Sequence, residues 1–99
     1  MSAAYAWEKL YLAVRALATE NQPLRGRLYD VYWHNLLILK THPIPWGDLR
    51  QKFEDICHEL APPGADPKKV LAAWPDEDVS RIAGQVVDLF VAISRRHPG

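Results

Sequence analysis

The residue pair most suggestive of catalysis is Cys57, which is followed directly by His58. A cysteine nucleophile needs a base within hydrogen-bond reach. Both residues fall in the segment WGDLRQKFEDICHEL, whose periodicity predicts a helix, and neighbouring residues on a helix point about 100° apart. Cys57 also lies at the edge of an apolar stripe, where a cysteine usually behaves as a small buried hydrophobe. We therefore expect no nucleophile–base pair.

The histidines and carboxylates show no metal-binding pattern. No two of His34, His42, His58 and His97 have the i, i+4 spacing that places two ligands on one helix face. We expect His34 and His58 to be exposed and His42 to lie in a turn. The chain contains no glycine-rich phosphate loop, no GxSxG and no HExxH motif. The sequence predicts no enzyme, no cofactor and no metal, although a site assembled from scattered residues leaves no motif and stays an alternative.

Composition and charge fit a soluble globular chain. Apolar residues make up 48% and charged residues 24% of the 99 residues, a length at which one domain over 1–99 is expected. Twelve basic and twelve acidic residues cancel, so the clustered surplus that nucleic-acid binding requires is missing. A single cysteine, with no membrane span and no signal peptide, predicts a cytoplasmic protein.

A small DNA-binding or DNA-associated helical regulator is the alternative from a different functional class. Its footprint is weak: Lys68 and Lys69 lie after a loop that is too long and proline-rich for a helix-turn-helix. Arg15, Arg25 and Arg27 form at most a small basic patch, and such residues more often solvate a helix flank. We therefore expect no nucleic-acid partner.

Helical periodicity runs through every long segment, and prolines separate the segments. Asp66 and Pro67 suit the N-cap and first position of a short helix, and Asp48 with Gln51 has the spacing of a capping box. The predicted fold is all-α, a compact antiparallel bundle of four main helices plus one short connecting helix. The four main helices are predicted over 3–20, 23–41, 46–60 and 76–96, and the connecting helix over 67–74.

The same periodicity predicts which side of each helix faces the core. Asn35 falls in the middle of one core face, where an amide needs a hydrogen-bond partner. It is either a satisfied structural amide or a selector of oligomeric state. The predicted core residues are Trp7, Leu10, Val14, Leu17 and Ala18 on the first helix, Leu28, Val31, Tyr32, Asn35, Ile38 and Leu39 on the second, Leu49, Phe53, Ile56 and Leu60 with Cys57 beside them on the third, and Val79, Ile82, Val86, Leu89, Phe90 and Ile93 on the last.

A second apolar stripe runs along the far side of the second helix. Tyr29, Trp33 and Leu37 have i, i+4, i+8 spacing and form a continuous ridge. Either other helices of the same chain cover this ridge, or it stays exposed until a second chain covers it. A helix that is apolar nearly all round is usually a buried one, which supports the first alternative. A four-helix chain has little material with which to bury two faces of two helices, which supports the second.

The last helix is also apolar beyond one stripe. Val87 and Val91 widen its apolar arc, and Gly84 adjoins them. A mid-helix glycine costs about 1 kcal/mol relative to alanine, so Gly84 needs a reason, such as close approach of another backbone. Trp46, in the PIPWGD corner, is either a further exposed anchor or a lid over the core.

These observations predict a non-enzymatic protein–protein interaction or regulatory module. We expect it to self-associate through the second and last helices and to act as a homodimer or as the small partner of a larger protein. We expect neither a membrane partner nor a small-molecule substrate. The predicted partner-binding residues are Tyr29, Trp33, Leu37, Val87 and Val91.

Overall fold

Helices account for most of residues 3–97, the part of the chain that the computed structural model describes. No strand occurs among these residues, and the predicted all-α bundle is confirmed. The elements are α1 (Ala3–Thr19), α2 (Leu24–Val31), the π-helical segment η1 (Tyr32–Leu36), the 3₁₀ segment η2 (Leu37–Lys40), α3 (Gly47–Leu60), α4 (Pro67–Ala73) and α5 (Asp76–Arg96).

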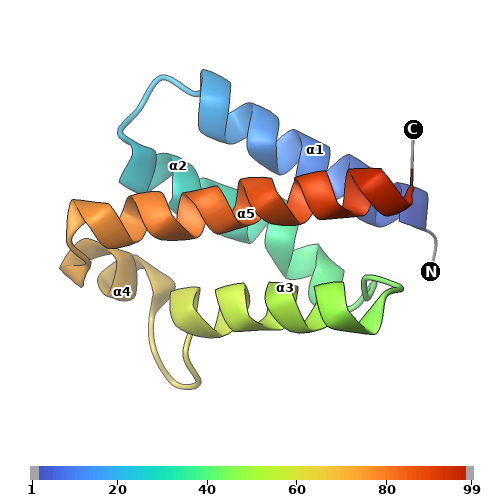
Figure 1. The fold of residues 1–99 in the computed structure, drawn as a ribbon. Helices are drawn as coiled ribbons and strands as arrows, with labels where there is room; N and C mark the ends of the chain where they lie inside the picture. Colours follow the sequence, from blue (N-terminus) through green and yellow to red (C-terminus); the bar gives the residue numbers. More distant parts are fainter. Residues whose placement is uncertain (1–2, 98–99) are drawn as a thin grey trace.

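The helix α5 is the centre of the arrangement (Figure 1). It packs against α1, α2 and α3, and both α1 and α3 run antiparallel to it. The segment α2–η1 lies behind α5 in this view, and the short α4 lies at the N-terminal end of α5. All of these elements contribute side chains to one apolar core cluster. None of the helices in the described range is long and apolar enough to cross a membrane.

The buried face of α1 differs from the predicted one. Its fully buried residues are Ala6, Leu10, Ala13 and Leu17, whereas Ala18, predicted to face the core, is exposed. The helix is rotated so that two alanines face the centre of the bundle. Small side chains allow the closely packed neighbours of α1 to approach its backbone, and the bulky aromatic residues are left at the margin.

That margin is an aromatic contact between α1 and α5. Trp7 and Tyr11 stack at 5.4 Å between ring centroids, and the Phe90 ring lies 5.7 Å from Trp7 and 6.2 Å from Tyr11. The indole Nε1 of Trp7 donates to Ser94 Oγ at 3.0 Å, which satisfies the one polar atom of a half-buried ring. Trp7 and Phe90 were predicted as core residues, and both are half-buried.

The second predicted helix changes geometry along its length. It is α-helical to Val31, becomes π-helical over Tyr32–Leu36 and ends as a 3₁₀ segment at Lys40. A π turn accommodates one residue more than an α turn, so the face that follows it rotates relative to an uninterrupted helix. Leu36 is therefore buried in the core, and Asn35, predicted to be there, is only half-buried.

The apolar stripe of α3 agrees with its prediction, but the start of the helix does not. Its buried residues are those predicted, Leu49, Phe53, Ile56, Cys57 and Leu60. No side chain caps its N-terminus, so the predicted capping box is wrong. Its two members bind other residues instead: Asp48 accepts two hydrogen bonds from Arg96 of α5, and Gln51 donates to Asp55. A guanidinium is a stronger partner for a carboxylate than a backbone amide, which explains the exchange.

The ends of α4 and α5 agree with the predictions. Asp66 caps α4, because its Oδ1 accepts from the Lys68 amide at 3.0 Å and Pro67 occupies the first turn. The helix α5 spans the predicted range, with three acidic residues in its first turn and Arg95 and Arg96 in its last. Negative charge at the N-terminus and positive charge at the C-terminus both complement the helix dipole.

Candidate functional site

The ridge formed by Tyr29, Trp33 and Leu37 is partly open to solvent. The Trp33 side chain is 44% exposed, whereas Tyr29 and Leu37 are half-buried and pack against the core. The Trp33 ring meets Tyr29 edge-on at 6.3 Å between centroids and Tyr32 at 5.5 Å. Edge-to-face contacts of this kind are favourable, so the indole is held in place rather than free. Neither α1 nor α4 covers it completely.

An apolar groove adjoins one end of the ridge. It lies between α2 and α4, has a volume of about 300 Å³ and is lined by Pro23, Gly26, Tyr29, Leu71 and Ala72, with Arg25 and Lys68 beside them. Its apolar lining suits a side chain of similar character from a partner. Sequence periodicity did not indicate this groove, because it forms where two helices that are distant in sequence meet.

Val87 and Val91 form a second exposed group, on α5. Their side chains are 36% and 40% exposed, and Tyr11 of the neighbouring α1 is 39% exposed. Phe90, between them in sequence, contacts Trp7 and Tyr11, whereas the Trp33 ring contacts Tyr29 and Tyr32. The five predicted partner-binding residues therefore fall into two groups with different neighbours.

Gly84 lies on the outer side of α5, and its environment differs from the predicted one. A Cβ atom built at this position meets nothing within 4 Å, so no backbone of the same chain approaches it closely. A close approach of another backbone, the reason that the sequence suggested for this glycine, is therefore not found among the described residues. The energetic cost of a mid-helix glycine is thus not explained by contacts among the described residues.

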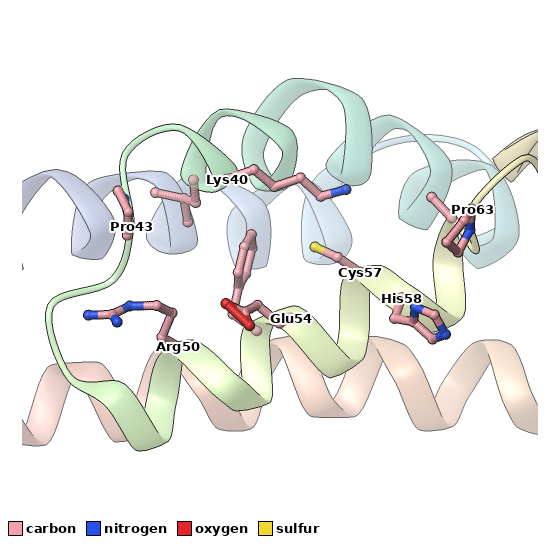
Figure 2. A pocket seen from close by; sticks show the side chains of 10 residues that line it. Lys40, Pro43, Arg50, Glu54, Cys57, His58 and Pro63 are labelled. Atoms are coloured by element: carbon pink, nitrogen blue, oxygen red, sulfur yellow. The ribbon is translucent and has the colours of Figure 1, made fainter.

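A pocket lies between α3 and the η2 segment, and Cys57 forms part of its wall (Figure 2). Its volume is about 470 Å³, and its lining combines the apolar Leu39 and Phe53 with the charged Lys40 and Glu54. The Cys57 sulfur points toward η2, whereas the His58 ring lies beside Pro63. His34 and His58 are both exposed, as predicted.

The chemistry of this pocket is limited by the state of its thiol. Cys57 is 2% exposed, and burial raises the pKa of its thiol to about 12, although the nearby Lys40 ammonium opposes that rise. The thiolate is the nucleophilic form, so at neutral pH Cys57 is a poor nucleophile. Arg50 has a structural partner, because its Nε donates to the Ile44 carbonyl at 2.8 Å. Among residues 3–97 no three His, Cys, Asp or Glu side chains gather closely enough to hold a metal ion.

The arginines between the first two helices have structural partners. Arg27 donates to the Leu17 carbonyl near the end of α1, and Arg25 donates to the Leu71 carbonyl near the end of α4. Carbonyls in the last turn of a helix lack partners within the helix, so a cationic side chain there stabilises the helix end. Arg25 also forms an ion pair with Asp76 at 2.8 Å. These contacts reduce the basic surface that a nucleic acid would meet.

Trp46 folds back over the bundle. It is half-buried, packs against the core cluster, and the Arg96 guanidinium lies 5.9 Å from its ring centroid. Of its two predicted roles, the lid agrees with this position. The exposed aromatic surface is therefore concentrated at the Trp33 ridge and at the α1–α5 margin.

Comparisons of the chain with protein-family models, with curated proteins and with solved structures found no match.

Proposed function

We propose that this chain is a non-enzymatic helical protein–protein interaction or regulatory module that self-associates or docks on a larger protein. The exposure of Trp33 carries the proposal: at 44%, its side chain is the most exposed of the large apolar side chains among residues 3–97. Tryptophan is enriched at the energetic centres of interfaces, because burial of its large ring releases much apolar surface from water. The proposed docking surface is the ridge of Tyr29, Trp33 and Leu37, and Val87 and Val91, which form a separate exposed group on α5, are secondary contact residues.

Two local features support this role for the ridge. The edge-on contacts with Tyr29 and Tyr32 hold the Trp33 ring in place before any partner arrives, which lowers the entropic cost of binding. The ring also lies in the π-helical segment η1, and π turns inside α-helices occur frequently at functional sites. The groove beside Tyr29 offers a place for an apolar side chain of the partner.

The variant Trp33→Glu tests the proposal. We expect it to fold, with a loss of no more than about 2 kcal/mol of unfolding free energy, because the indole is only partly buried. We expect it to lose association, because a carboxylate in the centre of an apolar interface is costly. Thermal unfolding measures the first effect. Sedimentation velocity of the wild type and the variant measures loss of self-association. In a separate experiment, a photoreactive residue at position 33 is crosslinked in the protein's native cells, and the adduct's mass distinguishes a second copy from another protein.

His34 provides the matched control. It is exposed and next to Trp33 but lies outside the ridge. We therefore expect a photoreactive residue at position 34 to give little adduct, and we expect His34→Glu to associate like the wild type. Equal adduct yields at positions 33 and 34 would contradict the ridge proposal. Micromolar binding to random duplex DNA in a low-salt mobility-shift assay would instead favour the DNA-binding alternative, because contacts to the phosphate backbone are strongest at low salt.

A further inference from the structure

A stripe of exposed residues follows the outer side of α5 from one end to the other. At about 100° per residue its members fall within an arc of about 80°. All of them are exposed, and none faces α2 or α3. This α5 stripe consists of Glu77, Ser80, Gly84, Val87, Val91 and Arg95.

The two ends of the α5 stripe carry opposite charges that pair with no other residue in the described part of the chain. The adjacent residues Asp76, Asp78 and Arg96 each take part in an ion pair. Within residues 3–97, Glu77 and Arg95 take part in neither an ion pair nor a side-chain hydrogen bond. An acidic side chain and a basic side chain thus remain available at opposite ends of one apolar stripe.

The α5 stripe is complementary to itself when it is reversed. Glu77 and Arg95 are equally far from Val86 in sequence, on opposite sides, and Gly84 and Val87 lie on either side of nearly the same point. A twofold axis near Val86 therefore places the acidic end of one stripe against the basic end of the other. A parallel pair would instead place like charges together.

The shape at the centre of the α5 stripe fits the same arrangement. Gly84 has no side chain, and the space over it is empty of atoms within 4 Å of a Cβ position. Val87 lies on the other side of the proposed twofold axis from Gly84, and its side chain is exposed on the same face of α5. In an antiparallel pair the valine of each copy fills the space over the glycine of the other, as ridges fill grooves between packed helices.

We infer that the α5 stripe is the docking surface for a second copy of this chain, in an antiparallel pair about a twofold axis. Glu77 of each copy pairs with Arg95 of the other, and Val87 of each copy packs over Gly84 of the other. The inference rests on the proposed function, because it assigns self-association to one face and leaves the Trp33 ridge for other contacts. One helix face is a small interface, so the dissociation constant is expected to be on the order of micromolar or weaker.

A charge exchange between the two ends of the stripe tests the pairing. Glu77→Arg and Arg95→Glu each place like charges opposite one another at both ends of the pair, which raises the dimer dissociation constant at least about tenfold. The double variant E77R/R95E exchanges the charges and restores the dissociation constant to within about threefold of the original. Sedimentation velocity of the full chain over a concentration series at low salt measures all four proteins.

Two further variants complete the experiment. Glu20→Arg is the control, because it makes the same charge change at an exposed position just after α1, outside the stripe. It is expected to leave the dimer dissociation constant unchanged. Gly84→Arg places a bulky side chain in the empty space, so it dissociates the pair while thermal unfolding shows an intact fold. A chain that is monomeric at millimolar concentration would overturn the inference, and so would a dimer that tolerates Gly84→Arg or a double variant that stays monomeric.

The same series separates this inference from the proposed function. If Trp33→Glu dissociates the dimer and Glu77→Arg does not, self-association uses the ridge, and the inference fails while the proposed function stands. If the charge exchange behaves as expected and position 33 gives no adduct above position 34, the ridge proposal fails and the α5 pairing stands.

Discussion

Burial decides what the single cysteine can do at the scale of one residue. Cys57 is next to His58 in sequence, but its sulfur points toward η2 while the imidazole lies beside Pro63. Burial raises the pKa of the thiol to about 12, so the neutral form predominates at physiological pH. Both the direction of the side chain and its protonation state separate Cys57 from the nucleophile that its position beside a histidine suggests.

The pKa of Cys57 predicts a pH dependence of stability. An unfolded thiol loses its proton near pH 9.0, whereas the folded one keeps it to about 12. The unfolded state therefore gains stability by ionisation in this window, and the unfolding free energy falls as pH rises, by at most about 1.4 kcal/mol per pH unit. Urea unfolding at pH 8 to about 11 measures the slope. Cys57→Ala is expected to show a shallower slope, and parallel slopes for the two proteins would contradict the prediction.

The Asp48–Arg96 pair predicts the opposite dependence at acid pH. Arg96 donates to the two carboxylate oxygens of Asp48 at 2.7 and 2.5 Å, and this contact lowers the pKa of Asp48 from 3.8 to about 2. The contribution to stability is present above pH 3.8 and is lost as pH falls through about 2. The effect is small, because both side chains are exposed.

Melting temperatures of the wild type and Asp48→Asn measure this contribution. The wild type is expected to melt higher at pH 7, and the difference is expected to shrink as pH approaches 2. Asp55→Asn is the control, since Asp55 is an exposed carboxylate of the same helix whose partner, Gln51, is uncharged. A difference between wild type and Asp48→Asn that is constant with pH would show that the ion pair has no net effect.

At the scale of the element, the rotation of α1 is a testable feature. Ala13 is fully buried and Ala18 is exposed, although the apolar pattern predicted Ala18 on the core face. Ala13→Leu is therefore expected to lower the unfolding free energy by about 1–3 kcal/mol, because extra methyl groups in a packed core force neighbours to move. Ala18→Leu, on the same helix, is expected to change it by less than about 0.5 kcal/mol. Chemical denaturation measures both, and the reverse order would support the orientation that the sequence predicted.

The second predicted helix shows a limit of periodicity. Its existence and its end near Lys40 were predicted, because proline boundaries and apolar spacing are local signals. The π turn over Tyr32–Leu36 was not, because it follows from how the segment packs against its neighbours. One extra residue in a turn was enough to exchange Asn35 for Leu36 in the core. The idea of Asn35 as a buried selector of oligomeric state loses its structural basis.

At the scale of the whole molecule, α5 organises both the core and the surface. Its inner face supplies buried residues to one core cluster, and ion pairs with Arg25 of α2, Asp48 of α3 and Glu59 of α3 link it to its neighbours. Glu77 and Arg95 on its outer stripe take part in none of these ion pairs. The molecule therefore has two distinct candidate contact surfaces, the Trp33 ridge and the α5 stripe, which Trp33→Glu and Glu77→Arg test separately.

The sequence by itself determined the helices, their approximate ends and the stripe of α3, whereas it left open whether Trp33 is exposed. These features depend on spacing, proline and charge within one segment, which local physics controls. Only the tertiary structure decided which side of α1 faces inward, that Asp48 binds Arg96 instead of capping α3, and that Gly84 is open. Those outcomes depend on which side chains from different helices compete for the same volume or the same partner, and a pattern within one segment carries no information about that competition.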